Sequence, residues 1–235
     1  MKEIFENFQI YHYKKISSTH LEALNLIDSG IFDETVILAD EQTCGRGRIE
    51  RKWISPLGNL YASFIINERT NPDRLTEFVY IISLAIGNTL LSNDINVQYK
   101  WPNDVLVDGK KIAGILLSKP SNKDWLVVSI GVNIVCAPLP HTTCISDYSA
   151  IIISNVDLLK KIIIHFNELK KKLILFSDIR EAWIKRAFKM NEKININFAD
   201  KSYSGIFIGI DKYGKLMLEQ ENKNTIYFDS GELFE

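Results

Sequence analysis

Cysteine and histidine are scarce in this chain of 235 residues. Its three cysteines, Cys44, Cys136 and Cys144, leave one unpaired in any disulfide scheme and lack the spacing of metal ligands, which argues against a disulfide framework and a zinc site. The four histidines are scattered and form no cluster. The simplest prediction is a reduced, cytoplasmic protein without a metal site of its own.

Long apolar runs and an excess of charge are also missing. The apolar stretches near residues 78–86 and 162–166 are too short to span a bilayer, and residues 1–15 lack the apolar core of a secretory signal. We therefore expect no membrane partner. The net charge is -1, whereas a dedicated nucleic-acid binder should carry a strong basic excess, so we expect no DNA partner either.

What the chain does have is a basic, glycine-containing segment at residues 45–61, GRGRIERKWISPLGNLY. Glycine lets the backbone approach a ligand closely, arginine forks match phosphate oxygens, and Trp53 offers a surface for a flat ring. The basic residues of the segment are Arg46, Arg48, Arg51 and Lys52. Such a loop predicts a phosphorylated, ring-bearing ligand such as a nucleotide. Cys44 beside it is interpreted as a space-filling residue.

Helices and strands are marked by capping signals and periodicity. A capping box at residues 19–22 begins a helix that Gly30 ends, and a β-branched run at 35–39 predicts a buried strand leading into the basic loop. A strand at 60–66 leaves the loop. Further helices are predicted from Pro72 to about residue 91, at 156–173 and at 179–188.

The turn Asp108-Gly109 is a strong hairpin signal between strands at 105–107 and 112–117, and residues 125–134 predict one more strand. These elements do not alternate as βαβ units. Hairpins predominate, so we expect an α+β fold with a mixed, mainly antiparallel sheet and helices against one face.

From about residue 193 the pattern changes to short alternating strands. Residues 194–198 alternate with period two, and turns are predicted at 199–201, 211–214 and 221–224. This spacing predicts a small β-barrel or sandwich. We therefore expect two domains, a larger one at 1–190 and a small one at 191–235.

Isolated residue patterns leave alternatives open. Lys110 and Lys111 should point to opposite faces of a strand, so one can face inward, but a solvated hairpin tip fits equally well. Gly114 would allow close approach of a ligand or of another backbone. Asn133 could pair with a purine edge, although an asparagine in a turn is the commoner explanation. Ser18 and Thr19 could cap the first helix, and Gln42 could simply face solvent.

Taken together, these segments resemble the biotin protein ligases. The matching segments occur in the same order: SST (17–19), EQTCGRGR (41–48), RKWISPLGNLYAS (51–63), KWPNDVLVDGKKIAGIL (100–116), GVNI (131–134), GIFIGIDKYGKLMLEQ (205–220) and SGE (230–232). The GRGR…W and KWPND…K-x-A-G-I pair is highly specific.

The resemblance implies a two-step ligase reaction. Biotin and ATP would give biotinyl-5′-AMP and pyrophosphate, with Mg²⁺ on the phosphates. A lysine of a biotin carboxyl carrier domain, from acetyl-CoA or propionyl-CoA carboxylase, would then take the biotin. The resemblance also implies a catalytic domain like that of class II aminoacyl-tRNA synthetases and a C-terminal barrel of Src-homology-3 type. The oligomeric state stays open, with a homodimer among the alternatives.

The resemblance also implies residue roles. The ligand-binding residues would be Ser18, Thr19 and Gln42 at the ureido ring, Gly45, Arg46, Arg48 and Arg51 in the loop over the adenylate, Trp53 and Asn133 at adenine, Asn103, and Lys111 and Gly114 at biotin. The catalytic residues would be Lys111, Arg48, Arg46 and Asp104. The roles of Asn103 and Asp104 stay open among orienting Lys111, binding Mg²⁺ or ribose, and assisting deprotonation of the acceptor lysine.

Two residues depart from the family pattern. Glu50 stands where glycine is common, and His20 replaces an asparagine common after SST. Only sixteen residues precede SST, which leaves no room for a helix-turn-helix domain, so we expect a ligase without repressor activity. The alternatives are a lipoate or octanoyl ligase, which would carry an RRxSGGG-type loop, a non-catalytic binding module, and an RNA-binding protein, which the net charge disfavours.

Overall fold

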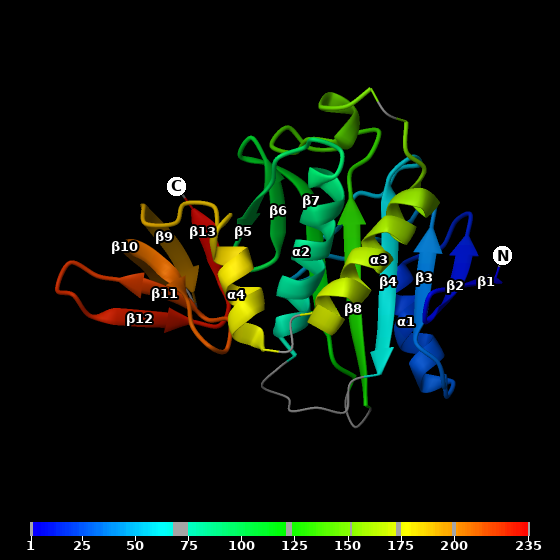
Figure 1. Ribbon diagram of the computed structural model, residues 1–235, viewed down its shortest axis with the longest axis horizontal. Coiled ribbons are helices and arrows are strands. Elements are labelled where there is room, and N and C mark those ends of the chain that lie inside the picture. The colour runs from blue at the N-terminus through cyan, green and yellow to red at the C-terminus, as the bar shows by residue number, and fades with distance from the viewer. Residues whose placement is uncertain are drawn as a thin grey trace.

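The computed structural model describes residues 2–67, 75–120, 124–150, 152–172, 175–198 and 201–234. Two lobes lie side by side, a larger one built around an eight-stranded sheet and a smaller one built around a five-stranded sheet (Figure 1). Helices pack on the larger sheet, so the predicted α+β class is confirmed.

The larger sheet has the strand order β1-β2-β3-β4-β8-β7-β6-β5. Its neighbouring strands are antiparallel except β2 and β3, which run parallel and therefore need a crossover. Helix α1 (Thr19–Asp28) supplies that crossover. The strands are β1 (Lys2–Phe5), β2 (Phe8–Tyr13), β3 (Thr35–Ala39), β4 (Leu60–Asn67), β5 (Gln98–Lys100), β6 (Asp104–Val107), β7 (Lys110–Ser118) and β8 (Trp125–Val132).

Helices cover both faces of this sheet, so the expectation of helices against one face was wrong. Alternate residues of a strand point to opposite faces. Ile37, Ile65 and Val127 pack against α1, whereas their neighbours in the strands join the core under α2 (Glu77–Leu91) and α3 (Asn155–Lys172). Strand β3 is buried along its whole length for this reason.

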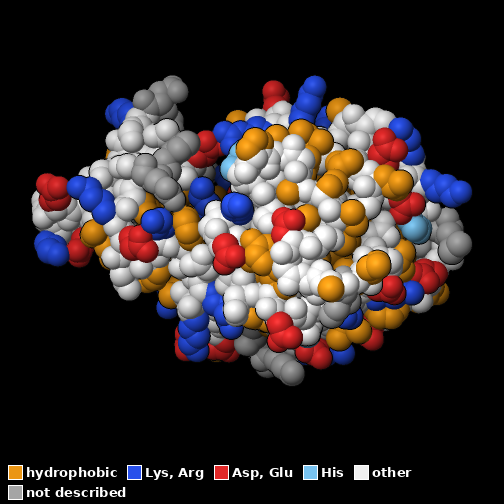
Figure 2. Space-filling view, turned by 90° about the horizontal axis from the view of Figure 1, so that it is seen from above, with side chains coloured by type: hydrophobic (Ala, Val, Ile, Leu, Met, Phe, Trp, Pro, Cys, Tyr) orange, Lys and Arg blue, Asp and Glu red, His pale blue; other side chains and the backbone are white. Residues whose placement is uncertain are grey.

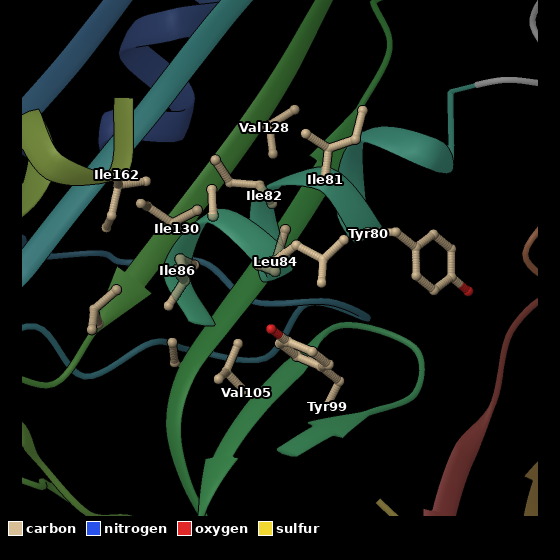
Figure 3. Packing of buried hydrophobic residues seen from close by; sticks show 14 of the residues in the cluster. Tyr80, Ile81, Ile82, Leu84, Ile86, Tyr99, Val105, Val128, Ile130 and Ile162 are labelled. Carbon is tan, nitrogen blue, oxygen red and sulfur yellow. The ribbon is translucent and has the colours of Figure 1, made fainter. Parts of the chain in front are cut away.

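Helix α2 lies at the centre of the main core (Figure 3). Ile82 and Ile86 of α2 pack with Val128 and Ile130 of β8, and each such buried side chain stabilises the fold by about 1.5–3 kcal/mol. The predicted start at Pro72 lies outside the described residues. The described part of the chain holds no helix that combines the length and apolarity needed to cross a bilayer.

Helix α4 (Phe176–Ile184) ends four residues earlier than the predicted 188. The reason is an extended pairing with β5: the Tyr99 N–H donates to Arg186 O, and the Phe188 N–H donates to Tyr99 O, both at 2.8 Å. This pairing carries the chain from the larger lobe into the smaller one. A short 3₁₀ helix, η2 (Ile145–Asp147), lies earlier in the chain, after β8.

The smaller sheet is antiparallel, with the order β12-β11-β10-β9-β13. Its strands are β9 (Lys193–Phe198), β10 (Lys201–Ile210), β11 (Leu216–Glu219), β12 (Thr225–Phe228) and β13 (Glu232–Phe234). The predicted turns at 211–214 and 221–224 are confirmed, while residues 199–200 of the third lie outside the described chain. The prediction of a closed barrel was wrong. A sheet closes into a barrel only when its two end strands pair with each other, whereas the end strands here, β12 and β13, pair with β11 and β9.

One turn of the smaller lobe is fastened to the larger lobe. The carbonyl oxygen of Gly214 accepts hydrogen bonds from the Tyr80 hydroxyl at 2.6 Å and from Trp101 Nε1 at 3.2 Å. Gly214 has φ +80°, and a Cβ there would collide with the Tyr80 ring, so glycine is required. This junction holds the smaller lobe against the larger one.

Candidate functional site

A cavity of about 560 Å³ opens between the larger sheet, the basic loop and the start of β13. Its size is typical of sites for small ligands. Figure 2 shows several Lys and Arg side chains gathered where the smaller lobe meets the larger one. Six Lys or Arg residues line the cavity against two carboxylates, Asp104 and Glu232, although the whole chain is nearly neutral. The cavity therefore favours an anionic ligand.

The structure brings nearly all the predicted site residues to this cavity. Those that line it are Ser18, Thr19, Gln42, Arg46, Arg48, Arg51, Trp53, Asn103, Asp104, Lys111, Gly114 and Asn133. The exception is Gly45, which does not line the cavity but packs against Trp53 and Ser55 of the basic loop. Its carbonyl oxygen accepts from the Trp53 N–H at 2.9 Å, and a Cβ at Gly45 would collide with the Trp53 carbonyl and with Ser55 Oγ.

The hairpin of β6 and β7 delivers a lysine to the cavity wall. Lys111 Nζ lies 2.7 Å from Asp104 Oδ1, and both side chains are about a quarter exposed or less. Lys110, its neighbour in β7, is exposed. The turn residues Asp108 and Gly109 both have positive φ, as a tight hairpin turn requires. The inward-facing lysine is therefore Lys111, and the solvated tip is Lys110.

Arg48 reaches the same region from the basic loop. It donates to Asn103 Oδ1 at 3.0 Å, and Asn103 is itself fixed by donating to Ile115 O at 2.7 Å. Burial lowers the pKa of Arg48 from its ordinary value, and the nearby carboxylates Asp104 and Glu232 oppose that shift. Arg48 nevertheless keeps its charge, since a guanidinium is not deprotonated in proteins.

Two glycines form a flat floor beside these cations. Gly114 of β7 and Gly131 of β8 are direct register partners, so neither strand raises a side chain there. The Trp53 indole lies on this floor, close enough that a Cβ on either glycine would collide with it. Lys111 Nζ stands 5.1 Å from the centre of the same ring, in cation–π range.

Apart from Asp104 Oδ1, which is in the ion pair with Lys111, three buried polar atoms in the cavity wall have no hydrogen-bond partner within the described residues: Ser18 Oγ, Trp53 Nε1 and Asn133 Oδ1. An unpaired buried polar atom costs stability, so a native structure normally keeps one where a ligand or water completes it. The Asn133 amide is fixed by donating to Thr143 O at 3.0 Å, which leaves its oxygen for a ligand donor.

Thr19 and Gln42 are held together. The backbone N–H of Thr19 donates to Gln42 Oε1 at 2.8 Å and its hydroxyl does so at 3.2 Å. Gln42 is therefore part of the wall and does not simply face solvent. Ser18 precedes α1, but its side chain makes no capping hydrogen bond, which removes the capping explanation for that residue.

Some cavity residues had no role in the sequence-based prediction: His20, His141, Phe188, Glu232 and Leu233. Glu232 forms an ion pair with Arg51 and so ties the start of β13 to the basic loop. Glu232 belongs to the SGE segment, which was a usable signal. The others have no local signal, because they meet the cavity only through long-range packing. No cluster of three or more His, Cys, Asp or Glu side chains suited to a metal occurs in the described ranges.

A cationic cavity with a glycine floor, an inward lysine and unpaired polar atoms defines a protein that binds an anionic, ring-bearing small molecule. Comparison with known proteins gives the family. Residues 14–134 match the biotin/lipoate A/B protein ligase family, and residues 189–234 match the biotin protein ligase C-terminal domain.

Individual relatives agree. A biotin–acetyl-CoA-carboxylase ligase of Paracoccus denitrificans is 30% identical over 87% of this chain and 91% of its own length. The bifunctional ligase/repressor BirA of Bacillus subtilis is 27% identical over 96% of this chain and 74% of its own. The Aquifex aeolicus biotin protein ligase in complex with biotin and ATP superposes with a TM-score of 0.79 at 25% identity, covering 96% of this chain and 97% of that one.

The chain belongs to the biotin/lipoate A/B protein ligase family, among its biotin protein ligases. The resemblance inferred from the sequence motifs is confirmed, and the chain is an enzyme of the ligase class.

Proposed function

We propose that the cavity joins biotin to ATP, giving biotinyl-5′-AMP and pyrophosphate, and then transfers the biotin to a lysine of a biotin carboxyl carrier domain. The observation that carries the proposal is the Lys111–Asp104 pair beside the Gly114–Gly131 floor, inside a cavity rich in positive charge. The floor seats the Trp53 indole, whose other face would stack on a ligand ring, and the cations would meet phosphates.

In the first step, a carboxylate oxygen of biotin forms a bond to the α-phosphorus, and the bond to the leaving pyrophosphate breaks. Both reactants are anions, so the barrier falls if positive groups already stand where they meet. Lys111, Arg46 and Arg48 would supply that charge. Lys111 must leave Asp104 or share it, because its Nζ now lies 2.7 Å from that carboxylate. Mg²⁺ would enter with the triphosphate.

The unpaired polar atoms support the placement of the two ring systems. Ser18 Oγ, with Thr19 and Gln42 beside it, would hold the ureido ring of biotin at one end of the cavity. Asn133 Oδ1 would accept from the adenine amino group, and Trp53 would pack on the adenine ring.

In the second step, the acceptor lysine amine attacks the acyl carbonyl, the anhydride bond breaks, and AMP leaves. No protein nucleophile is needed, since the acceptor brings its own. We propose that Asp104 assists removal of the amine proton, because its carboxylate lines the cavity beside Lys111. Closure of the basic loop over the adenylate would exclude water from the anhydride.

The acceptor is proposed to be the carrier domain of acetyl-CoA carboxylase, with propionyl-CoA carboxylase as a second candidate. The Paracoccus relative, which is named for the first of these, supports that order. Division at residues 1–190 and 191–235 is supported by the start of β9 at Lys193 and by the family match at 189–234. The synthetase-like and Src-homology-3-like classifications, the homodimer and the cytoplasmic location remain predictions.

Biotin-dependent exchange of labelled pyrophosphate into ATP tests the first step. Exchange should appear with biotin and Mg²⁺ and should be absent without biotin. Tight biotin binding with no exchange would instead identify a non-catalytic binding module. Exchange supported by lipoate or octanoate but not by biotin would identify the lipoate-ligase alternative.

A further inference from the structure

A chain of hydrogen bonds runs along the cavity wall from the basic loop to helix α1, and four of its members, Thr19, His20, Gln42 and Ser129, line the cavity. Its first part has a fixed direction. The Trp53 carbonyl can only accept, so Ser55 Oγ donates to it at 2.9 Å. The Ser55 oxygen then accepts from Gln42 Nε2 at 2.9 Å. The other atom of the amide, Gln42 Oε1, accepts from the Thr19 N–H, which can only donate.

The direction passes on to the next hydroxyl groups. The Thr19 hydroxyl donates its single proton to Gln42 Oε1, so at its other contact it must accept, and Ser63 Oγ donates to it at 2.9 Å. Ser63 thereby uses its proton and accepts from Ser129 Oγ at 2.8 Å. Ser129 in turn must accept from its remaining partner, the Nδ1 of His20, also at 2.8 Å.

His20 is therefore the donor at the end of the chain. Its Nδ1 must carry a proton, and its Nε2, 3.2 Å from Ser118 Oγ, is the acceptor of a neutral ring. His20 is 6% exposed and lines the cavity. Burial, with a smaller effect of the nearby Arg46, lowers the pKa of His20 to about 4, which keeps the ring neutral at pH 7.

The direction of the chain determines what the cavity offers a ligand. Since Thr19 has given its proton to Gln42, its hydroxyl oxygen can only accept from a ligand, which must bring an N–H or O–H donor. The unpaired Ser18 hydroxyl beside it is free to donate. A cyclic urea carries both N–H donors and a carbonyl acceptor, whereas the dithiolane ring of a lipoyl group carries no donor.

We infer that His20, as the donor that ends this hydrogen-bond chain, holds the chain in the direction that Gln42 sets, and is thereby a positioning residue that makes the cavity specific for a ligand head with N–H donors. The inference rests on the proposed function, whose biotin ureido ring is such a head. Replacing His20 by a residue that cannot donate to Ser129 would free the Ser129, Ser63 and Thr19 protons to reorient. The acceptor that faces the ligand would then no longer be fixed.

Nitrogen NMR of the histidine rings tests the direction without any ligand. The chain has four histidines, so ¹⁵N-histidine labelling of the full chain gives four ring systems, and the His20→Asn variant identifies the signals of His20. At pH 7 the expected state is neutral, with the proton on Nδ1. A proton on Nε2 alone, or a charged ring, would overturn the inference.

Biotin affinity, measured by calorimetry, tests the consequence. Asparagine places its amide where Nδ1 stands and can still donate to Ser129, whereas glutamine reaches only the position of Nε2. His20→Asn should bind biotin within about threefold of the unchanged protein. His20→Gln and His20→Leu should bind about tenfold more weakly, the effect of one hydrogen bond.

ATP affinity and the thermal midpoint serve as controls for folding. ATP should bind all three variants alike, because the His20 ring bonds Ser129 and Ser118 and neither of the residues proposed to hold adenine, Trp53 and Asn133. Equal loss of ATP and biotin binding would indicate a merely structural role. If the unchanged protein binds no biotin, the proposed function fails, while the NMR result still decides the direction of the chain. If it binds biotin and His20→Gln binds as well as His20→Asn, the inference itself fails.

Discussion

Replacing Lys111 with alanine should slow biotinyl-adenylate formation by roughly 10²–10³-fold while Lys110→Ala changes it little. The two lysines are adjacent in β7 and carry the same charge, but Lys110 is exposed and Lys111 faces the cavity, 2.7 Å from Asp104. A positive group prearranged at a developing negative charge is worth about 2.7–4 kcal/mol of barrier, which gives that factor. The long-range charge effect of either change is the same, so their difference isolates position.

Stability should change less than activity. Lys111→Ala leaves the Asp104 carboxylate, which is about a fifth exposed, without its ion-pair partner, at a cost of about 1–3 kcal/mol. Single-turnover release of pyrophosphate at saturating biotin and ATP, with urea unfolding as the folding control, measures both effects. An adenylation rate within threefold of the unchanged protein, or equal losses in the two variants, would refute the reasoning.

Three further outcomes are expected. Burial lowers the pKa of His20 in the folded protein to about 4 from its ordinary value of 6.5, so the contribution of His20 to stability is complete above pH 6.5 and is lost as pH falls towards 4. About 3 kcal/mol of pH-dependent unfolding free energy should therefore be absent in His20→Asn. A pH dependence of unfolding equal to that of the unchanged protein would contradict this. Gly131→Ala should push the Trp53 indole off the strand pair, seen as a change in tryptophan fluorescence and a loss of about 1–3 kcal/mol in urea unfolding, and an unchanged spectrum would count against the packing. Gly214→Ala should lower the thermal midpoint, because its Cβ would meet the Tyr80 ring at a positive φ, and a midpoint equal to that of the unchanged chain would show that this junction carries little stability.

Local chemistry explains which parts of the fold were predictable. The Asp108-Gly109 turn needs no distant partner to adopt positive φ, and the hairpin was predicted correctly. The hairpin of β1 and β2 was missed because its turn, at Glu6 and Asn7, has no glycine, although Glu6 adopts positive φ. The sequence also could not predict which face of the larger sheet α1 covers, because the residues of β3 are buried on both faces.

The site divides in the same way. Residues in continuous motifs, such as Arg48 and Lys111, were predicted because their spacing alone is informative. Gly114 and Gly131 lie opposite each other because of the register between β7 and β8, and a local sequence pattern does not predict that register. His20 was noticed only as a departure from the family. Its hydrogen bonds reach Ser129, more than a hundred residues away, and only folding brings the two together.

The departure at Glu50 has a partial explanation. Glu50 and Ile49 both adopt positive φ at the tip of the basic loop, and Glu50 is exposed. Its charge therefore lies towards solvent, whereas Arg46 and Arg48 line the cavity. Nothing in the structure explains why glutamate stands there in place of a glycine, which would adopt positive φ without strain.

The central claim is that this cavity transfers biotin to a carrier lysine. Its most direct test is the intact mass of an apo biotin carboxyl carrier domain after incubation with the protein, biotin, ATP and Mg²⁺, beside the same domain with its acceptor lysine replaced by arginine. We expect one biotinyl addition to the first domain and none to the second. An unchanged mass for a carrier domain that another biotin protein ligase does modify would contradict the claim.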